Sequence, residues 1–236
     1  MKNDKIINGN CWVAYLDLLG FQDYVLKFDH PENPQAYGVF VEEIYNRVLE
    51  SVSKWACGSR ILVVWFSDTF LLYSSDDSYE SFVAIAYSAS YACSTLVMRH
   101  YPVRGALGTG RLYADQERNI FVGSALIDAY KYGEKQDWIG FVITPQAGEK
   151  FNERVAGKEG DKKTPWTCCD YYEYDVPMKG ENGKPYTERL WAANIGQIQY
   201  VRTVINDGAN SRDSRVRIKY ENTKKFLEYL DKRRAK

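Results

Sequence analysis

YLDLLGF, at residues 15–21, closes a nearly continuous apolar run that begins at Trp12. Such a run predicts a buried central strand, because a strand covered on both faces has no polar side to alternate with. The strand is expected to end at Asp17 and to lead into a turn at Gly20. A carboxylate therefore stands at the end of a buried strand.

A second aspartate, Asp68, lies 51 positions further on, in the run WFSDT at residues 65–69. Runs typical of β-strands flank it at 61–66 and 70–73, so residues 67–69 are expected to form the tip of a tight hairpin. Carboxylates are hard oxygen ligands that suit Mg²⁺ or Mn²⁺. Because paired metal ions can clamp both oxygens of a phosphoryl displacement, the two aspartates point to nucleotidyl transfer.

The flanking sequence predicts a mixed α/β architecture. Apolar spacing indicates a long helix over 37–52 and another from a cap at Ser78 to a point before Pro102. A glycine-rich strand at 103–110, a short helix at 123–133, a strand at 138–143 and a helix starting at Pro145 follow. The order βαββαβαβ predicts a mixed sheet with helices packed over one face.

The C-terminal third is less patterned. Residues 152–164 and 178–187 are expected to be exposed loops, with edge strands at 171–176 and 190–195. A terminal helix with a basic end is predicted for 214–236. We expect residues 8–150 to form the core and 151–236 to be an elaboration of the same domain.

Composition limits the possible partners and the cellular setting. Acidic and basic residues balance at 31 each, which argues against nucleic acid or an anionic membrane as a partner and favours a small molecule. The five cysteines include the adjacent Cys168 and Cys169 but no C-x-x-C pair, and the N-terminus lacks an apolar signal core. We expect no segment to approach the roughly 20 apolar residues of a membrane span. A cytoplasmic protein is the simplest interpretation.

Taken together, the motifs YLDLLGF, FSD (66–68) and VRGALGTG (103–110) resemble the successive core motifs of class III nucleotidyl cyclases, the adenylate and guanylate cyclases. The resemblance covers roughly residues 12–145. It looks closest to the pyrimidine (uridylate and cytidylate) cyclases of bacterial Pycsar antiphage systems, through FSDT at 66–69 and GSALIDAY at 123–130. The fold implied is the cyclase or palm-like mixed sheet with helices packed on it, plus C-terminal strands and a terminal helix.

The resemblance implies a homodimer with composite active sites and two Mg²⁺ or Mn²⁺ ions in each. The reaction would convert a nucleoside triphosphate, with UTP favoured over CTP, to a 3′,5′-cyclic monophosphate and pyrophosphate. The product would activate a separate effector in antiphage defence.

Residue by residue, the resemblance assigns roles around the two motifs. Asp17 and Asp68 match the metal-binding aspartates, with Leu18 at the same site, and the backbone of residues 18–21 matches the turn that approaches the triphosphate. Exposed N–H groups at a turn leading into a helix favour phosphate on physical grounds as well. The substrate-binding set is Leu19, Gly20, Phe21, Trp65, Thr69 and Arg104.

The sequence also departs from the family pattern. Trp65 stands where tyrosine or arginine is expected at the base-selecting position, while Thr69 fits. Ile127 and Lys131 occupy the positions of an asparagine and an arginine that act on the transition state. Lys131 is therefore the candidate for that charge, with Arg104 or Arg111 as substitutes.

Other functions stay open. The missing asparagine favours a catalytically inactive cyclase-like module that binds nucleotides or regulates a partner, and a purine cyclase would share the same core. A palm-type polymerase or a cyclic-dinucleotide synthase is disfavoured, because the chain is neutral and the GG(D/E)EF signature is absent. We expect Asp17→Ala or Asp68→Ala to abolish synthesis while leaving the fold largely intact.

Overall fold

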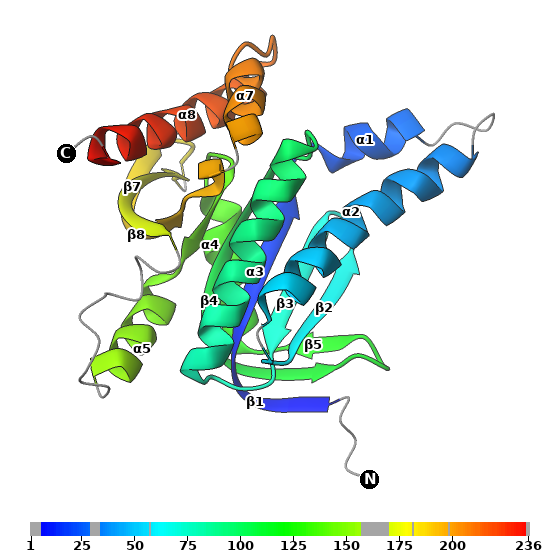
Figure 1. The fold of residues 1–236 in the computed structure, drawn as a ribbon, viewed down its shortest axis with the longest axis vertical. Coiled ribbons are helices and arrows are strands. Elements are labelled where there is room, and N and C mark those ends of the chain that lie inside the picture. Colours follow the sequence, from blue (N-terminus) through cyan, green and yellow to red (C-terminus); the bar gives the residue numbers. More distant parts are fainter. Residues whose placement is uncertain are drawn as a thin grey trace.

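The computed structural model describes residues 6–28, 34–56, 58–156, 170–180, 182–197 and 199–234 (Figure 1). In chain order the elements are β1 (Ile6–Leu18), α1 (Phe21–Phe28), α2 (Pro34–Trp55), β2 (Ile61–Phe66), β3 (Thr69–Ser74), α3 (Tyr79–Met98), β4 (Val103–Asp115), β5 (Ile120–Val122), α4 (Ser124–Lys135), β6 (Gly140–Ile143), α5 (Pro145–Ala156), β7 (Tyr171–Lys179), β8 (Pro185–Ala193), the short 3₁₀ helix η1 (Ile195–Gln197), α7 (Gln199–Gly208) and α8 (Ser214–Arg234).

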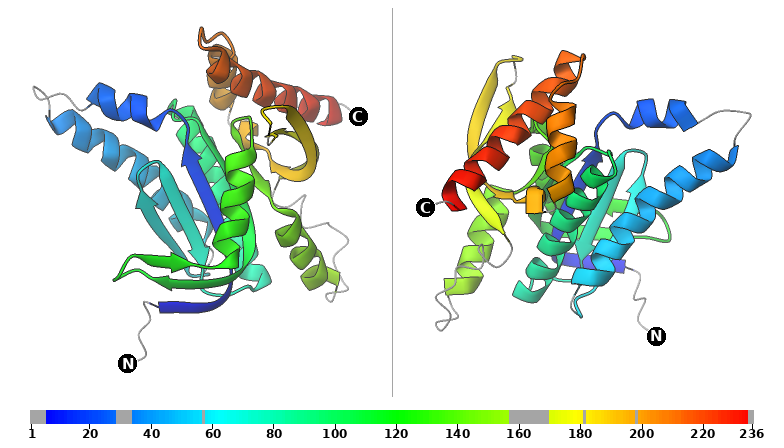
Figure 2. Two further views of the ribbon diagram at one scale, coloured as in Figure 1. Left: turned by 180° about the vertical axis from the view of Figure 1, so that it is seen from behind. Right: turned by 45° about the horizontal axis from the view of Figure 1, so that its top comes forward.

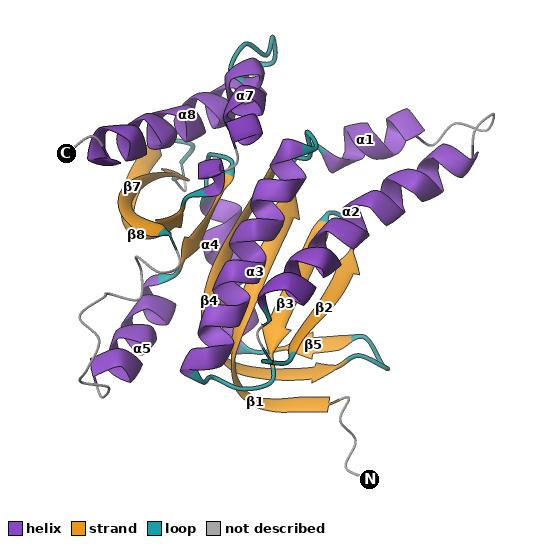
Figure 3. Ribbon diagram, in the orientation of Figure 1, coloured by secondary structure: helices purple, strands orange, loops and turns teal. Residues whose placement is uncertain are grey.

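One mixed sheet organises the chain, with the strand order β2-β3-β1-β4-β6-β8-β7 and β5 paired with β4 (Figure 3). β1 lies in the interior, antiparallel to both β3 and β4, and the β4–β6 pair is parallel. The predicted α/β class, the β2–β3 hairpin and the helices α2 and α3 are confirmed. The Ser78 cap is confirmed too, since the Ser81 N–H donates to the Ser78 hydroxyl at 3.2 Å.

Helices cover both faces of the sheet, so the expectation of one covered face was wrong. Trp12, Ala14 and Leu16 of β1 pack into the core beneath α2 and α3. The intervening Val13 and Tyr15 join a second cluster with Ala125 and Ala129 of α4 and other residues. Figure 2 shows α4 on the face opposite α3. The continuous apolar run in β1 arises from this burial on both faces.

The glycines of β4 permit close packing. A Cβ at Gly105 would lie 2.3 Å from the carbonyl oxygen of Tyr15 on β1, and one at Gly108 would lie 2.7 Å from the backbone nitrogen of Ala129 on α4. Both distances are impossible for real carbon atoms, so these two glycines have a packing explanation that requires no phosphate.

The C-terminal third extends the sheet through β8, which pairs with β6. The strands expected at 171–176 and 190–195 are present as β7 and β8, but the loop predicted at 178–187 was too long. β7 continues to Lys179 and β8 begins at Pro185. The basic terminal helix is confirmed as α8. The loop predicted at 152–164 was wrong over residues 152–156, which end α5, and its other residues lie outside the described ones, as do Cys57, Trp166, Cys168 and Cys169. The division at residue 150 stays a prediction.

α3 is the one helix among the described residues that is long and apolar enough to cross a membrane. The sequence had suggested no such segment, and in composition that expectation was wrong. Most of α3 is buried between the sheet and its neighbouring elements, as in the core helix of a globular domain. Its length and composition are therefore explained by packing.

Asp76 organises the start of α3 and gives a testable pH effect. Burial alone would raise its pKa, but hydrogen bonds from the Ser78 hydroxyl and N–H and the Ser81 hydroxyl lower it below the usual value. We expect Asp76→Ala to reduce the free energy of unfolding by about 1 kcal/mol at pH 7. A group with a depressed folded pKa stabilises above its unfolded pKa, so the difference should begin to shrink near pH 4 and be lost as the pH falls through the still lower folded pKa. Urea unfolding at pH 7 and pH 3 measures it; an equal loss at both would contradict this explanation.

Candidate active site

The sheet brings the two aspartates to one place. Asp17 at the end of β1 is in register with Thr69, the first residue of β3, and the Leu18 N–H donates to the Asp68 carbonyl oxygen at 2.8 Å. Both side chains line a pocket of about 500 Å³. The pocket includes most of the residues that sequence reasoning assigned to metal or substrate, namely Asp17, Leu18, Leu19, Gly20, Phe21, Asp68 and Arg104.

Local backbone geometry explains the two turns. Ser67, at the hairpin tip, has φ 56°, and Gly20 has φ 71°. Glycine suits the second turn because side chains disfavour that region, and it lets α1 begin at once with Phe21. The Leu19 N–H is used within the fold, since it donates to the Pro102 carbonyl oxygen at 2.8 Å. In the first turn of α1 the Asp23 N–H donates to the Gly20 carbonyl oxygen at 3.0 Å, which leaves the N–H groups of Phe21 and Gln22 as the ones that a helix start offers to a ligand.

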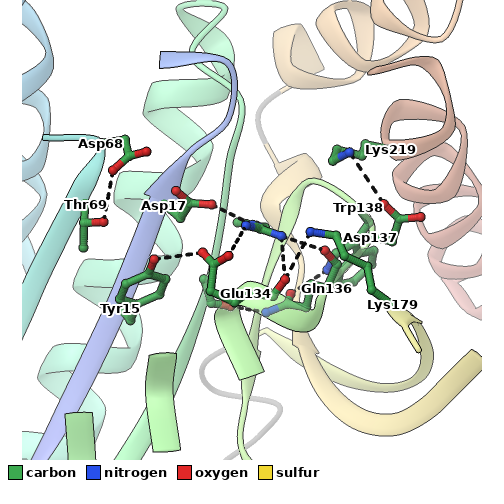
Figure 4. Close-up of polar contacts among 12 residues, drawn as sticks. Tyr15, Asp17, Asp68, Thr69, Glu134, Gln136, Asp137, Trp138, Lys179 and Lys219 are labelled. Atoms are coloured by element: carbon green, nitrogen blue, oxygen red, sulfur yellow. Dashed lines mark hydrogen bonds and ion pairs between the residues drawn. The ribbon is translucent and has the colours of Figure 1, made fainter. Parts of the chain in front are cut away.

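Arg104 is the centre of a buried hydrogen-bond network, whose acceptors Asp17, Glu134 and Gln136 are labelled in Figure 4. Its Nε donates to Asp17 Oδ2 at 2.7 Å, and one terminal nitrogen donates to Glu134 Oε2 at 2.8 Å. The other terminal nitrogen donates to the carbonyl oxygens of Glu134 at 2.7 Å and Gln136 at 3.1 Å. The Arg104 side chain is 7% exposed, so these contacts hold its guanidinium within the protein.

Sequence reasoning missed Glu134 and Tyr15. Glu134, near the end of α4, accepts a hydrogen bond from the Tyr15 hydroxyl at 2.9 Å as well as from Arg104. Both residues line the pocket with Asp17 and Asp68. No local sequence pattern predicts the contact between Tyr15 and Glu134, because α4 reaches Tyr15 only by packing on the second face of the sheet.

The electrostatics of Asp17 favour a cation. Burial raises its pKa; the Arg104 guanidinium opposes that effect, and the nearby carboxylates of Glu134 and Asp68 add to it. The Asp17 side chain is only 10% exposed. A buried carboxylate crowded by two others is stabilised by further positive charge.

The base-selecting candidates lie differently. The Thr69 hydroxyl donates to Asp68 Oδ1 at 3.4 Å, so Thr69 is beside the site. The Trp65 ring instead stacks on Phe70 and Tyr45, with centroid distances of 4.8 and 6.1 Å, and packs against the core on the α2 side. Neither lines the pocket, so their base-reading role stays a prediction.

The transition-state candidates are not at the pocket either. Lys131 is exposed on α4, and Ile127, one turn earlier, is 63% exposed. The structure therefore does not bring Lys131 to Asp17 and Asp68 within one chain. Its catalytic role stays a prediction that depends on the composite site of a dimer.

The oxygen ligands at the pocket fit a hard divalent cation that takes its remaining ligands from the phosphates of a substrate. Within the described ranges no group of three or more His, Cys, Asp and Glu side chains forms a cage for a metal. Asp17 and Asp68 supply carboxylates at the pocket, and only one oxygen of Asp17 is bonded to Arg104. Mg²⁺ and Mn²⁺ commonly bind through one or two carboxylates and substrate phosphates, so two aspartates suffice.

Comparisons with known proteins identify the fold. No protein-family model and no curated protein sequence matches the chain. Among solved structures, it is similar to the adenylyl cyclase CyaB from P. aeruginosa, with a TM-score of 0.52, 12% identity, and coverage of 80% of this chain and 96% of that one. It is also similar to the catalytic core of a rhodopsin-guanylyl cyclase with converted specificity, in complex with ATPαS, with a TM-score of 0.53, 11% identity, and coverage of 80% and 98%. The chain thus has the fold of class III adenylyl and guanylyl cyclase catalytic domains, which confirms the expected fold.

Proposed function

We propose that this chain, with the fold of a cyclase catalytic domain, is a metal-dependent nucleotidyl cyclase that converts UTP, with CTP as second choice, to a 3′,5′-cyclic monophosphate and pyrophosphate. One observation carries the proposal. Asp17 and Asp68, 51 positions apart in the sequence, line the same pocket beside the turn that starts α1. A shared fold alone would not require this arrangement.

Asp17 and Asp68, together with the backbone of Leu18, are the residues that would hold Mg²⁺ or Mn²⁺, two ions in each active site. When bound, the cations would lower the pKa of the ribose 3′-hydroxyl and neutralise charge on the phosphates. The N–H groups at the start of α1 would bind the phosphates, and the buried pocket wall would orient them for in-line attack. No protein nucleophile is required.

The pyrimidine assignment rests on the sequence motifs. Thr69 lies beside Asp68, to which its hydroxyl donates, and the hydroxyl oxygen could still accept a hydrogen bond from a uracil or cytosine edge. The proposal includes a cytoplasmic homodimer with composite sites, in which Trp65 and Lys131 would act on the nucleotide bound across the interface. The cyclic nucleotide would act on a separate effector in antiphage defence.

Incubation of the purified chain with ATP, GTP, CTP and UTP in turn, each with Mn²⁺ or Mg²⁺, tests the proposal. We expect mass spectrometry to identify cyclic UMP as the main product, with cyclic CMP second. Cyclic AMP or GMP as the main product would retain the cyclase and reject the pyrimidine assignment. Absence of any product under all conditions would overturn the proposal that the chain is an enzyme.

A second candidate function is a cyclase-like module that binds nucleotides without turnover. Ile127 favours it, because an exposed apolar side chain stands where many cyclases carry an asparagine that acts on the transition state. Calorimetric titration with UTP and CTP distinguishes the two functions. Tight binding without any product would support the module.

A further inference from the structure

The end of α4 and its connection to β6, residues 134–139 and below called the connection, are held by the C-terminal third of the chain. The Asp137 N–H donates to the Pro177 carbonyl oxygen of β7 at 2.9 Å. The Asn222 side chain of α8 donates to the Asp137 carbonyl oxygen at 2.9 Å, and Lys219 of α8 is 3.6 Å from the Asp137 carboxylate. Two separate C-terminal elements therefore fix this connection.

Side-chain packing fixes the same connection from inside. Trp138 is fully buried, with its ring 5.8 Å from that of Tyr174 on β7 and 5.1 Å from that of Phe226 on α8. Its indole N–H donates to Gln136 Oε1 at 2.6 Å, and Gln136 Nε2 donates to the Gly105 carbonyl oxygen at 2.9 Å. The connection is thus attached to β4 at the residue next to Arg104.

The connection in turn sets the orientation of Arg104. Three of the four acceptors around the guanidinium belong to residues 134–136, and the fourth is Asp17. A guanidinium is planar and its donors form a rigid fork, so fixing the terminal nitrogens fixes the direction of Nε. Nε meets Asp17 Oδ2 and leaves the other carboxylate oxygen for a ligand.

We infer that Glu134 is a positioning residue, through which the C-terminal third orients the Asp17 carboxylate. β7 and α8 fix residues 134–139, these residues fix Arg104, and Arg104 fixes Asp17. The inference rests on the proposed function, because it takes Asp17 as a cation ligand. Arg104 adds positive charge beside the site, so its benefit to cation binding is geometric: a ligand already oriented need not be ordered when the ion binds.

Direct Mn²⁺ binding tests this role without turnover. Free Mn²⁺ is measured by electron paramagnetic resonance in titrations of the full chain, without nucleotide. We expect Glu134→Gln and Glu134→Asp each to weaken binding by about fivefold or more, because neither can serve Arg104 and Tyr15 as Glu134 does. Glu134→Asp keeps the negative charge but shortens the side chain by one methylene. It therefore separates the effect of carboxylate position on Mn²⁺ binding from the effect of charge.

Glu188→Gln is the matched control. Like Glu134, Glu188 accepts a hydrogen bond from a tyrosine hydroxyl, here that of Tyr132 on α4 at 3.1 Å, but Glu188 does not line the pocket. It should stay within about twofold of the wild type. Wild-type affinity in Glu134→Asp would overturn the inference, since only charge would then matter. If the Glu134 variants do not fold, Tyr15→Phe removes one hydroxyl from the network, and unchanged binding in it would overturn the inference. The Asp68→Ala variant is titrated in the same way. If it binds Mn²⁺ as tightly as the wild type does, the proposed function is overturned as well.

Discussion

Asp68→Ala is expected to lower the rate of cyclic nucleotide formation by roughly a thousandfold or more, because it removes one of two carboxylates that would hold the catalytic cation. The fold should survive. The contact that ties the hairpin tip to β1 uses the Asp68 backbone carbonyl, which alanine retains. Among the described residues, its side chain makes one hydrogen bond, a long 3.4 Å contact with the Thr69 hydroxyl. Initial rates with saturating UTP and Mn²⁺ measure the loss, and the far-ultraviolet circular dichroism should be unchanged.

Asp207→Ala is the matched control, because it removes an exposed carboxylate on α7, outside the pocket. Its rate should stay within about twofold of the wild type. Substantial activity in Asp68→Ala would contradict the metal-site assignment, whichever nucleotide proves to be the substrate.

The two aspartates could be predicted because each depends on a local pattern. The apolar run before Asp17 and the β-rich runs around Asp68 define strands, and strand ends position the carboxylates. The Ser78 helix cap and the glycine-rich strand β4 could be predicted for the same reason. The β2–β3 hairpin places Asp68 directly before β3, but the pairing of β3 with β1, which brings the two aspartates together, joins strands that are far apart in the sequence.

The Arg104 network could not be predicted, because it depends on packing between distant elements. Glu134 reaches Arg104 only because α4 covers the second face of the sheet, which the order of elements did not reveal. The direction of the Trp65 side chain could not be predicted either. Its position four residues before Thr69 places it near the site in sequence, but strand alternation turns its ring toward Phe70 and Tyr45.

The same network separates the two aspartates as targets for mutation. The sequence suggested that Asp17→Ala and Asp68→Ala would both leave the fold intact. Asp17 accepts a hydrogen bond from the buried Arg104, whereas the Asp68 side chain has no comparable partner within the part of the chain that the structure describes. Asp17→Ala is therefore the less specific test of catalysis, because it also removes a partner of a buried guanidinium.

Arg104→Met should be the most destabilising single change at the site, lowering the free energy of unfolding by about 3 kcal/mol. Methionine fills much of the same volume but leaves the carboxylates of Asp17 and Glu134 facing each other without the cation between them. Two backbone carbonyl oxygens, of Glu134 and Gln136, lose their donor as well. For a chain of this length the melting temperature should fall by about 6–12 °C, which differential scanning calorimetry measures.

Arg111→Met is the control, since Arg111 is exposed on the same strand and its side chain donates to Asn8 at 3.2 Å. It should change the free energy of unfolding by about 0.5 kcal/mol or less. Adding Asp17→Asn to Arg104→Met should recover part of the lost stability, because it removes one of the two facing charges. A fall in stability that Asp17→Asn leaves unchanged would show that Arg104 stabilises the fold through packing and its bonds to the two carbonyl oxygens rather than through its charge. Recovery would show that its charge is needed because the site gathers carboxylates, as a cation-binding pocket must.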